Sequence, residues 1–164
     1  MLKPTKRILS VTIKRMIDES PDTSFLGEYS NSPDTEYAID RQKLGDQARN
    51  EFRYFNGPVE NYKGETPENI RKYIRQDYDR MESLNRGNWQ FIGIQAEATY
   101  VVGFTGDLQT VTSGGLWGIE SDSGKEYLES VQREELDSLK NDLIAVGFSR
   151  RAIATAFKNV EEAI

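Results

Sequence analysis

The sequence predicts an α+β fold, with a small, mainly antiparallel sheet, two longer helices packed on one face and a short C-terminal helix. Two observations point to this class. Residues 7–17 and 89–103 alternate apolar and polar side chains with a period of two, which is typical of half-buried strands. Residues 67–85 and 124–146 instead place apolar side chains three and four positions apart, which is the spacing of one helix face. We expect both helices to cover one face of the sheet.

The whole chain, residues 1–164, is expected to form a single α+β domain, because its length suits one core of ordinary size.

The first predicted strand is followed by a loop-rich region at about residues 18–65. Within the loop-rich region, the segments SPDTSFLGEY and SPDTEYAIDR each carry a Ser-Pro-Asp-Thr turn. The region also contains an aromatic cluster that suits either a core or a protein-binding surface: Phe52, Tyr54 and Phe55.

The predicted helices have recognisable ends. Thr66 and Pro67 are typical of an N-cap and a first helical residue, and Gly87 provides the stop. Between the two long helices, residues 89–103 and 107–119 are predicted to form an antiparallel hairpin. The second long helix is expected to end at Gly147, and a short last helix then carries the following residues: Ser149 as its cap, Ile153, Phe157 and Val160.

The segment TVTSGGLWGIESDSGKEYL, residues 110–128, joins this hairpin to the acidic second helix. We interpret it as architecture, in which the glycines bend or bulge the strand, Trp117 fills the core, and Asp122 and Ser123 cap the helix. A phosphate cradle is the alternative, but SGGLWG lacks the spacing of known phosphate-binding loops, and Glu120 beside it would repel an anion. The structural motif consists of Gly114, Gly115, Trp117, Gly118, Asp122 and Ser123.

The chain contains neither cysteine nor histidine. Their absence excludes disulfides and thiolate nucleophiles, and it removes the commonest zinc ligand and the commonest general base. No complete loop of oxygen ligands for calcium is present. We therefore expect no catalytic residue, no cofactor and no metal site, and a carboxylate-based hydrolase is the least favoured alternative.

The net charge of −6 is unevenly distributed along the chain. Five basic residues and no acid precede Asp18, whereas residues 120–142 hold eight acids and three bases, a local charge of −5. An acidic surface repels phosphate backbones, so we expect no direct nucleic-acid binding, but it complements a basic protein surface. The residues expected to contact a protein partner are Glu126, Glu129, Glu134, Glu135, Asp137, Asp22, Asp34 and Glu36.

Three segments carry a resemblance. WQFIGIQAEATYVV, TVTSGGLWGIESDSGKEYL and the later LIAVGF resemble a recurrent pattern in a group of small proteins from bacteriophages and mobile elements, whose hallmark is a TSGGLWGIESDS-type motif. The resemblance covers about residues 89–148. It implies a phage-associated context and carries over no catalytic residue.

These observations define an expected function. We expect an acidic accessory protein of a phage or mobile element that binds a protein and inhibits a nucleic-acid-handling host defence enzyme, of the anti-CRISPR or anti-restriction type. A structural or immunity-type protein without an inhibitory role is the alternative. No stretch reaches the length of a membrane span or has the core of a signal peptide, so the expected location is the bacterial host cytoplasm, without a membrane partner.

Overall fold

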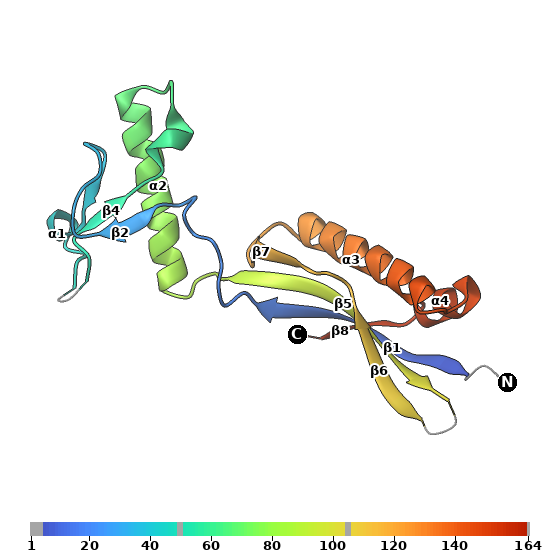
Figure 1. Ribbon diagram of the computed structural model, residues 1–164. Helices are drawn as coiled ribbons and strands as arrows, with labels where there is room; N and C mark the ends of the chain where they lie inside the picture. Colours follow the sequence, from blue (N-terminus) through green and yellow to red (C-terminus); the bar gives the residue numbers. More distant parts are fainter. Residues whose placement is uncertain (1–4, 49–50, 104–105, 164) are drawn as a thin grey trace. The chain divides into compact units, whose positions relative to one another are not determined.

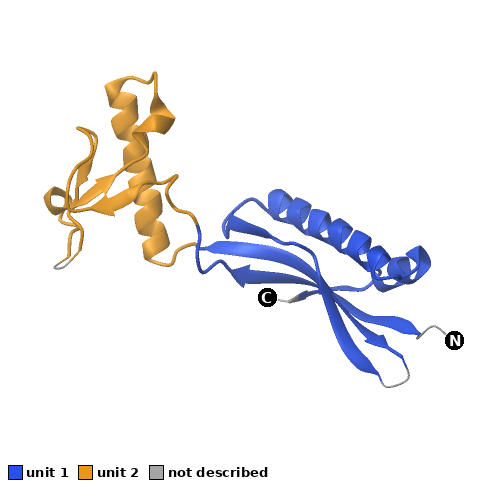
Figure 2. Ribbon diagram, viewed as in Figure 1, with its two compact units in different colours: residues 1–21, 90–164 blue, residues 22–89 orange. Residues whose placement is uncertain are grey.

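The computed structural model describes residues 5–48, 51–103 and 106–163 (Figure 1). The chain forms two compact units, coloured separately in Figure 2. Unit 1 comprises residues 1–21 and 90–164, and unit 2 comprises residues 22–89. Strands and helices occur in both units, and the larger sheet is mainly antiparallel, which confirms the α+β class. No helix among the described residues combines the length and the apolar character needed to cross a bilayer.

The sheet of unit 1 is built on the antiparallel pair β1 (Lys6–Ile17) and β5 (Phe91–Val102). β6 (Asp107–Thr112) and β7 (Leu116–Glu120) pair with successive parts of the free edge of β5. The predicted hairpin is therefore present, although its second strand is interrupted at residues 113–115. At the opposite edge of the sheet, β8 (Val160–Ala163) pairs in parallel with β1.

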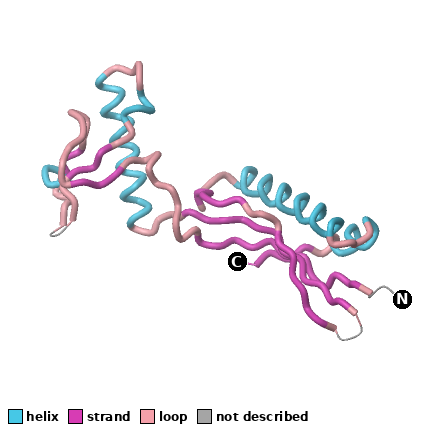
Figure 3. The backbone as a smooth tube through the Cα atoms, viewed as in Figure 1, coloured by secondary structure: helices cyan, strands magenta, loops and turns pink. Residues whose placement is uncertain are grey.

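Two helices cover one face of this sheet, as Figures 1 and 3 show. α3 (Lys125–Ala145) contacts β5 and β6, and α4 (Arg150–Ala156) contacts β1. Ser149 caps α4 as predicted, since its side chain accepts a hydrogen bond from the Ala152 N–H. The prediction that Val160 belongs to this helix was wrong, because Val160 begins β8 and pairs with β1. The core between the layers includes Val11, Ile13, Ile94, Ala96, Leu139, Leu143 and Ile153.

The C-terminus of α3 is fixed by backbone geometry. Gly147 adopts a φ of 98°, and the Phe148 N–H donates to the Leu143 carbonyl at 3.0 Å, so that the chain leaves the helix in a left-handed turn. Nζ of Lys6, at the start of β1, donates to the carbonyl of Val146 at 2.6 Å. A cation here also interacts favourably with the negative end of the helix dipole.

Unit 2 packs α2 (Pro67–Asn85) with short elements from the region predicted to be rich in loops. Thr66 caps α2, and Gly87, with a φ of 74°, ends it as expected. Phe55 is fully buried and its ring lies 5.2 Å from that of Tyr78, whereas Phe52 is 51% exposed, so the aromatic cluster divides between core and surface. The short elements are β2 (Glu28–Ser30), β3 (Ile39–Asp40), α1 (Arg41–Leu44), β4 (Tyr54–Asn56) and the 3-10 helix η1 (Val59–Tyr62).

Candidate functional site

The bend between β6 and β7 is anchored on β5 by buried polar groups. Ser113 is 1% exposed, and its hydroxyl oxygen accepts a hydrogen bond from the Ala96 N–H at 2.9 Å. The Ser113 N–H donates to the Ala96 carbonyl at 2.8 Å, and the side-chain amide of Gln95 donates to the Ser113 carbonyl at 2.8 Å. These bonds satisfy the backbone at the point where the strand changes direction.

Trp117 lies on the sheet surface, so the prediction that it fills the core was wrong. Its side chain is 46% exposed and covers Gly93 of β5, where an added Cβ atom would lie 2.3 Å from Cε3 of the indole. Ile92 and Ile94, which flank Gly93, belong to the core. Because side chains alternate along a strand, Trp117 occupies the sheet face opposite α3, and Ile119 takes the core position instead.

Two glycines of the motif bring their backbone N–H groups to carboxylates. Gly115 and Gly118 have φ values of 79° and 73°, which side-chain-bearing residues rarely adopt. The Gly115 N–H donates to Oε2 of Glu135 at 2.9 Å, and the Gly118 N–H donates to Oδ2 of Asp18 at 3.0 Å. These contacts tie the segment to α3 and to the end of β1.

The helix after the motif begins later than predicted. α3 starts at Lys125 with Gly124 as its N-cap, so neither Asp122 nor Ser123 occupies the predicted capping position. The Ser123 N–H donates to the Glu120 carbonyl at 3.0 Å, and this turn moves the helix start past both residues. The Ser121 hydroxyl oxygen accepts a hydrogen bond from the Gln90 N–H. The remaining motif residues, Gly114 and Asp122, are exposed.

The acids predicted on the second long helix occupy the outward face of α3, with one exception. Glu135 is only partly exposed, because its carboxylate binds the Gly115 N–H. Glu129 lies 3.6 Å from Lys125, and Asp137 is bonded to Lys140 at 2.9 Å. The exposed acids, which we call the α3 acidic row, are Glu126, Glu129, Glu134 and Asp137.

The predicted loop acids belong to unit 2 and make local contacts. The hydroxyl and the N–H of Ser24 bond to Oδ1 of Asp22, and both lower the pKa of that carboxyl. Glu36 forms an ion pair with Arg71 at 3.8 Å, and Asp34, two residues before Glu36, is exposed. The predicted partner-binding acids are therefore distributed over both units.

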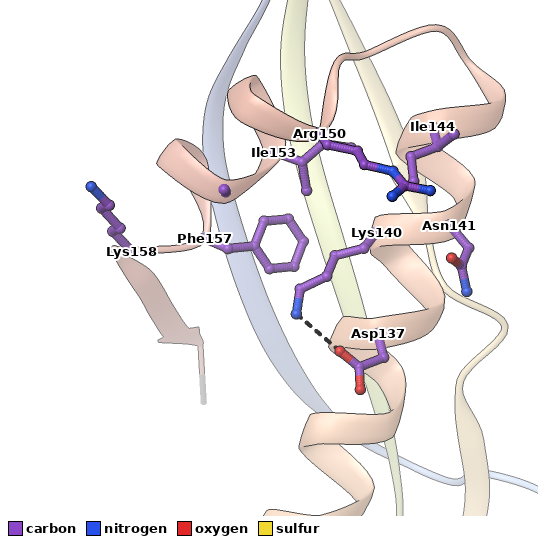
Figure 4. A pocket seen from close by; sticks show the side chains of 9 residues that line it. Asp137, Lys140, Asn141, Ile144, Arg150, Ile153, Phe157 and Lys158 are labelled. Atoms are coloured by element: carbon purple, nitrogen blue, oxygen red, sulfur yellow. Dashed lines mark hydrogen bonds and ion pairs between the residues drawn. The ribbon is translucent and has the colours of Figure 1, made fainter.

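A groove of about 590 Å³ lies between the C-terminal half of α3 and α4 (Figure 4). Ile153 is buried beneath it, and the ring of Phe157 and the 43% exposed side chain of Ile144 add apolar walls. Arg150 reaches from α4 toward α3 in this view. The charged residues that line the groove are three cations and one acid: Lys140, Arg150, Lys158 and Asp137.

A second basic recess, of about 500 Å³, borders α4 beside the first strand. It is lined by Lys6 and Arg7 of β1 and by Arg151 of α4, together with hydroxyl-bearing residues. The basic N-terminus, of which Lys3 lies outside the described residues, was assigned no function from the sequence. The segment SRRAIATAFKN, residues 149–159, has three cations and no acid, and this pattern is the local signal for a basic surface at α4.

Unit 2 contains a charged network around a buried arginine. Arg41 is 5% exposed, and its guanidinium donates to carboxylates of Glu51 and Glu82 at 3.0 and 3.2 Å and to the Tyr78 hydroxyl at 3.3 Å. Tyr78 in turn donates to Asp46 at 2.9 Å, and burial raises the pKa of its phenol to about 12. The buried Arg41 cation is compensated by carboxylates and its donors are hydrogen-bonded, which is the arrangement expected of a structural network.

Within the described residues, no group of three or more Asp or Glu side chains is arranged to hold a metal ion. No family model, curated protein or solved structure matches the chain. The α3 acidic row and the α3–α4 groove are therefore candidate surfaces on geometric and chemical grounds.

Proposed function

We propose that the protein is an accessory protein of a bacteriophage or mobile element that acts by binding another protein through the α3 acidic row. The phage context rests on the resemblance of residues 89–148. The observation that carries the binding role is the exposure of these acids on one rigid helix: among the described residues, neither Glu126 nor Glu134 forms an ion pair. Carboxylates that lack a cation within the molecule retain their attraction for a basic partner.

The proposed partner is a host defence enzyme that handles nucleic acid. The row runs from Glu126 to Asp137, which is about 16 Å at 1.5 Å per residue. A basic groove that normally holds a phosphate backbone offers several cations over such a length, and it attracts a row of carboxylates for the same reason. Binding there would exclude the nucleic acid without any catalytic chemistry.

The test compares two variants with equal changes in charge. One carries Glu126→Lys, Glu129→Lys and Glu134→Lys, and its control reverses three exposed acids of unit 2, Glu28, Glu60 and Glu65. Each tagged protein is expressed in a bacterial strain with a defined restriction or CRISPR system, where phage plaquing and co-purified proteins are measured at low and high salt.

The wild type and the unit 2 control should raise plaquing and retain a defence subunit at low salt, whereas the α3 variant should do neither. Capture should weaken as added salt shortens the Debye length below about 8 Å. Equal protection and equal capture by all three proteins would refute the α3 contact surface. An absence of protection by the wild type against every system would refute the inhibitory role.

A further inference from the structure

The α3–α4 groove is a second surface, which shares only Asp137 with the α3 acidic row that the proposed function uses. It combines an apolar interior with a cationic rim, on a chain whose net charge is −6. Among the described residues, neither Arg150 nor Lys158 forms an ion pair, whereas Lys140 is already bonded to Asp137. Two cations are thus available to a ligand: Arg150, which extends toward α3, and Lys158, which lies on the opposite side of Phe157 and points away from α3 (Figure 4).

The apolar interior is accessible in part. Ile144 is one of the exposed large apolar side chains of α3, and it lines the groove together with Phe157 and Ile153. Nζ of Lys140 lies 5.3 Å from the centre of the Phe157 ring, so the aromatic face and the cation are presented together. The groove volume is within the range of pockets that enclose a ligand group of one or a few side chains.

We propose that this groove binds an acidic peptide segment of a protein partner, which inserts a large apolar side chain between α3 and α4 and places carboxylates against Arg150 and Lys158. Charge complementarity selects an anionic partner, and the apolar walls select a side chain over a bare phosphate backbone. Nucleic acid needs cations but gains little from the exposed Ile144. The second basic recess, on the other side of α4, also has cations, but Ile8 is its one large apolar lining residue. It therefore serves as a comparison in which the charge is present and the apolar walls are largely missing.

The probe is a fluorescein-labelled peptide with leucine and phenylalanine one helical turn apart on a glutamate background. Two matched peptides replace the glutamates by lysine or the apolar residues by alanine. Fluorescence polarisation with the full chain should show saturable binding of the first peptide, weakening as salt rises, and at least tenfold weaker binding of the other two.

Two charge-reversed proteins locate the site. Arg150→Glu with Lys158→Glu should weaken binding at least tenfold, whereas Arg7→Glu with Arg151→Glu, an equal charge change in the second recess, should alter it less than threefold. Ala154→Trp, at an exposed groove position, should also weaken binding while every charge is kept. Circular dichroism of each variant verifies folding.

The proposal would be overturned if the acidic apolar peptide showed no saturable binding, or if both charge-reversed proteins lost peptide affinity equally. It would also be overturned if Ala154→Trp kept the affinity of the wild type. Equal or tighter binding of a labelled single-stranded oligonucleotide through Arg150 and Lys158 would assign the groove to nucleic acid. Sedimentation that shows a dimer, converted to monomer by the same double substitution, would assign it to a second copy of the chain.

Discussion

Replacing Gly93 by alanine should destabilise unit 1 by displacing Trp117. The added Cβ atom would lie 2.3 Å from Cε3 of the indole, a separation that cannot be accommodated without movement. Trp117 is 46% exposed, so about half of a side-chain area of up to ~250 Å² is covered, which corresponds to at most about 3 kcal/mol at ~25 cal/mol per Å². Overpacking of this kind typically costs 1–3 kcal/mol, and we expect about 2 kcal/mol for Gly93→Ala.

A double-mutant cycle with Trp117→Ala separates this clash from any general effect at β5. Urea unfolding followed by circular dichroism gives the free energy of unfolding of each protein. Once the indole is absent, Gly93→Ala should be nearly neutral, because the position of its Cβ atom becomes free. An equal cost of Gly93→Ala in both backgrounds, or a cost below about 0.5 kcal/mol in the wild type, would refute the stacking of Trp117 on Gly93.

Three further predictions concern polar groups. Arg41→Met should lower the free energy of unfolding of unit 2 by about 3 kcal/mol, because the largely buried Glu82 loses its closer cation and keeps the more distant Arg86, at 3.9 Å; an unchanged melting temperature would contradict this. Glu135→Ala should cost about 1–2 kcal/mol through the loss of its bond to a backbone N–H, whereas Glu134→Ala, its exposed neighbour, should be nearly neutral in the same urea titration. Burial raises the pKa of Tyr78 from 10.0 to about 12, so the unfolded chain loses this proton first. The free energy of unfolding should therefore fall as pH rises from 10 to 12. An equally steep fall with pH in a Tyr78→Phe variant would disprove this contribution.

Much of the secondary structure could be predicted because its signals are local. Thr66 and Pro67 mark the start of α2, and Gly87 and Gly147 adopt the positive φ angles that end the two long helices. The strands β1 and β5 follow from alternation within each segment. β8 could not be recognised in this way, because its residues include two adjacent glutamates and its strand character comes from pairing with β1, about 150 positions earlier.

The position of Trp117 depends on a residue that no local pattern identifies. Trp117 lies two residues after the double glycine and two residues before the buried Ile119. This spacing along a strand is compatible with a core position for Trp117. The deciding feature is Gly93, whose missing side chain leaves room for the indole on the sheet face away from α3. Positive φ angles at Gly115 and Gly118 also change the direction of the chain around the indole, so alternation cannot be counted through the motif.

The α3–α4 groove could not be predicted from charges counted along the sequence, because a partner meets charges that the fold brings together on a surface. The helix α4 brings Arg150 beside the end of α3, and Lys158 follows α4 at the edge of the groove, while the acids of α3 extend from its first turn. One unit therefore presents carboxylates and cations on neighbouring parts of the same helical layer. A chain that is acidic as a whole can then attract a basic partner at one place and an acidic peptide at another, because screening limits each interaction to charges within about 8–10 Å.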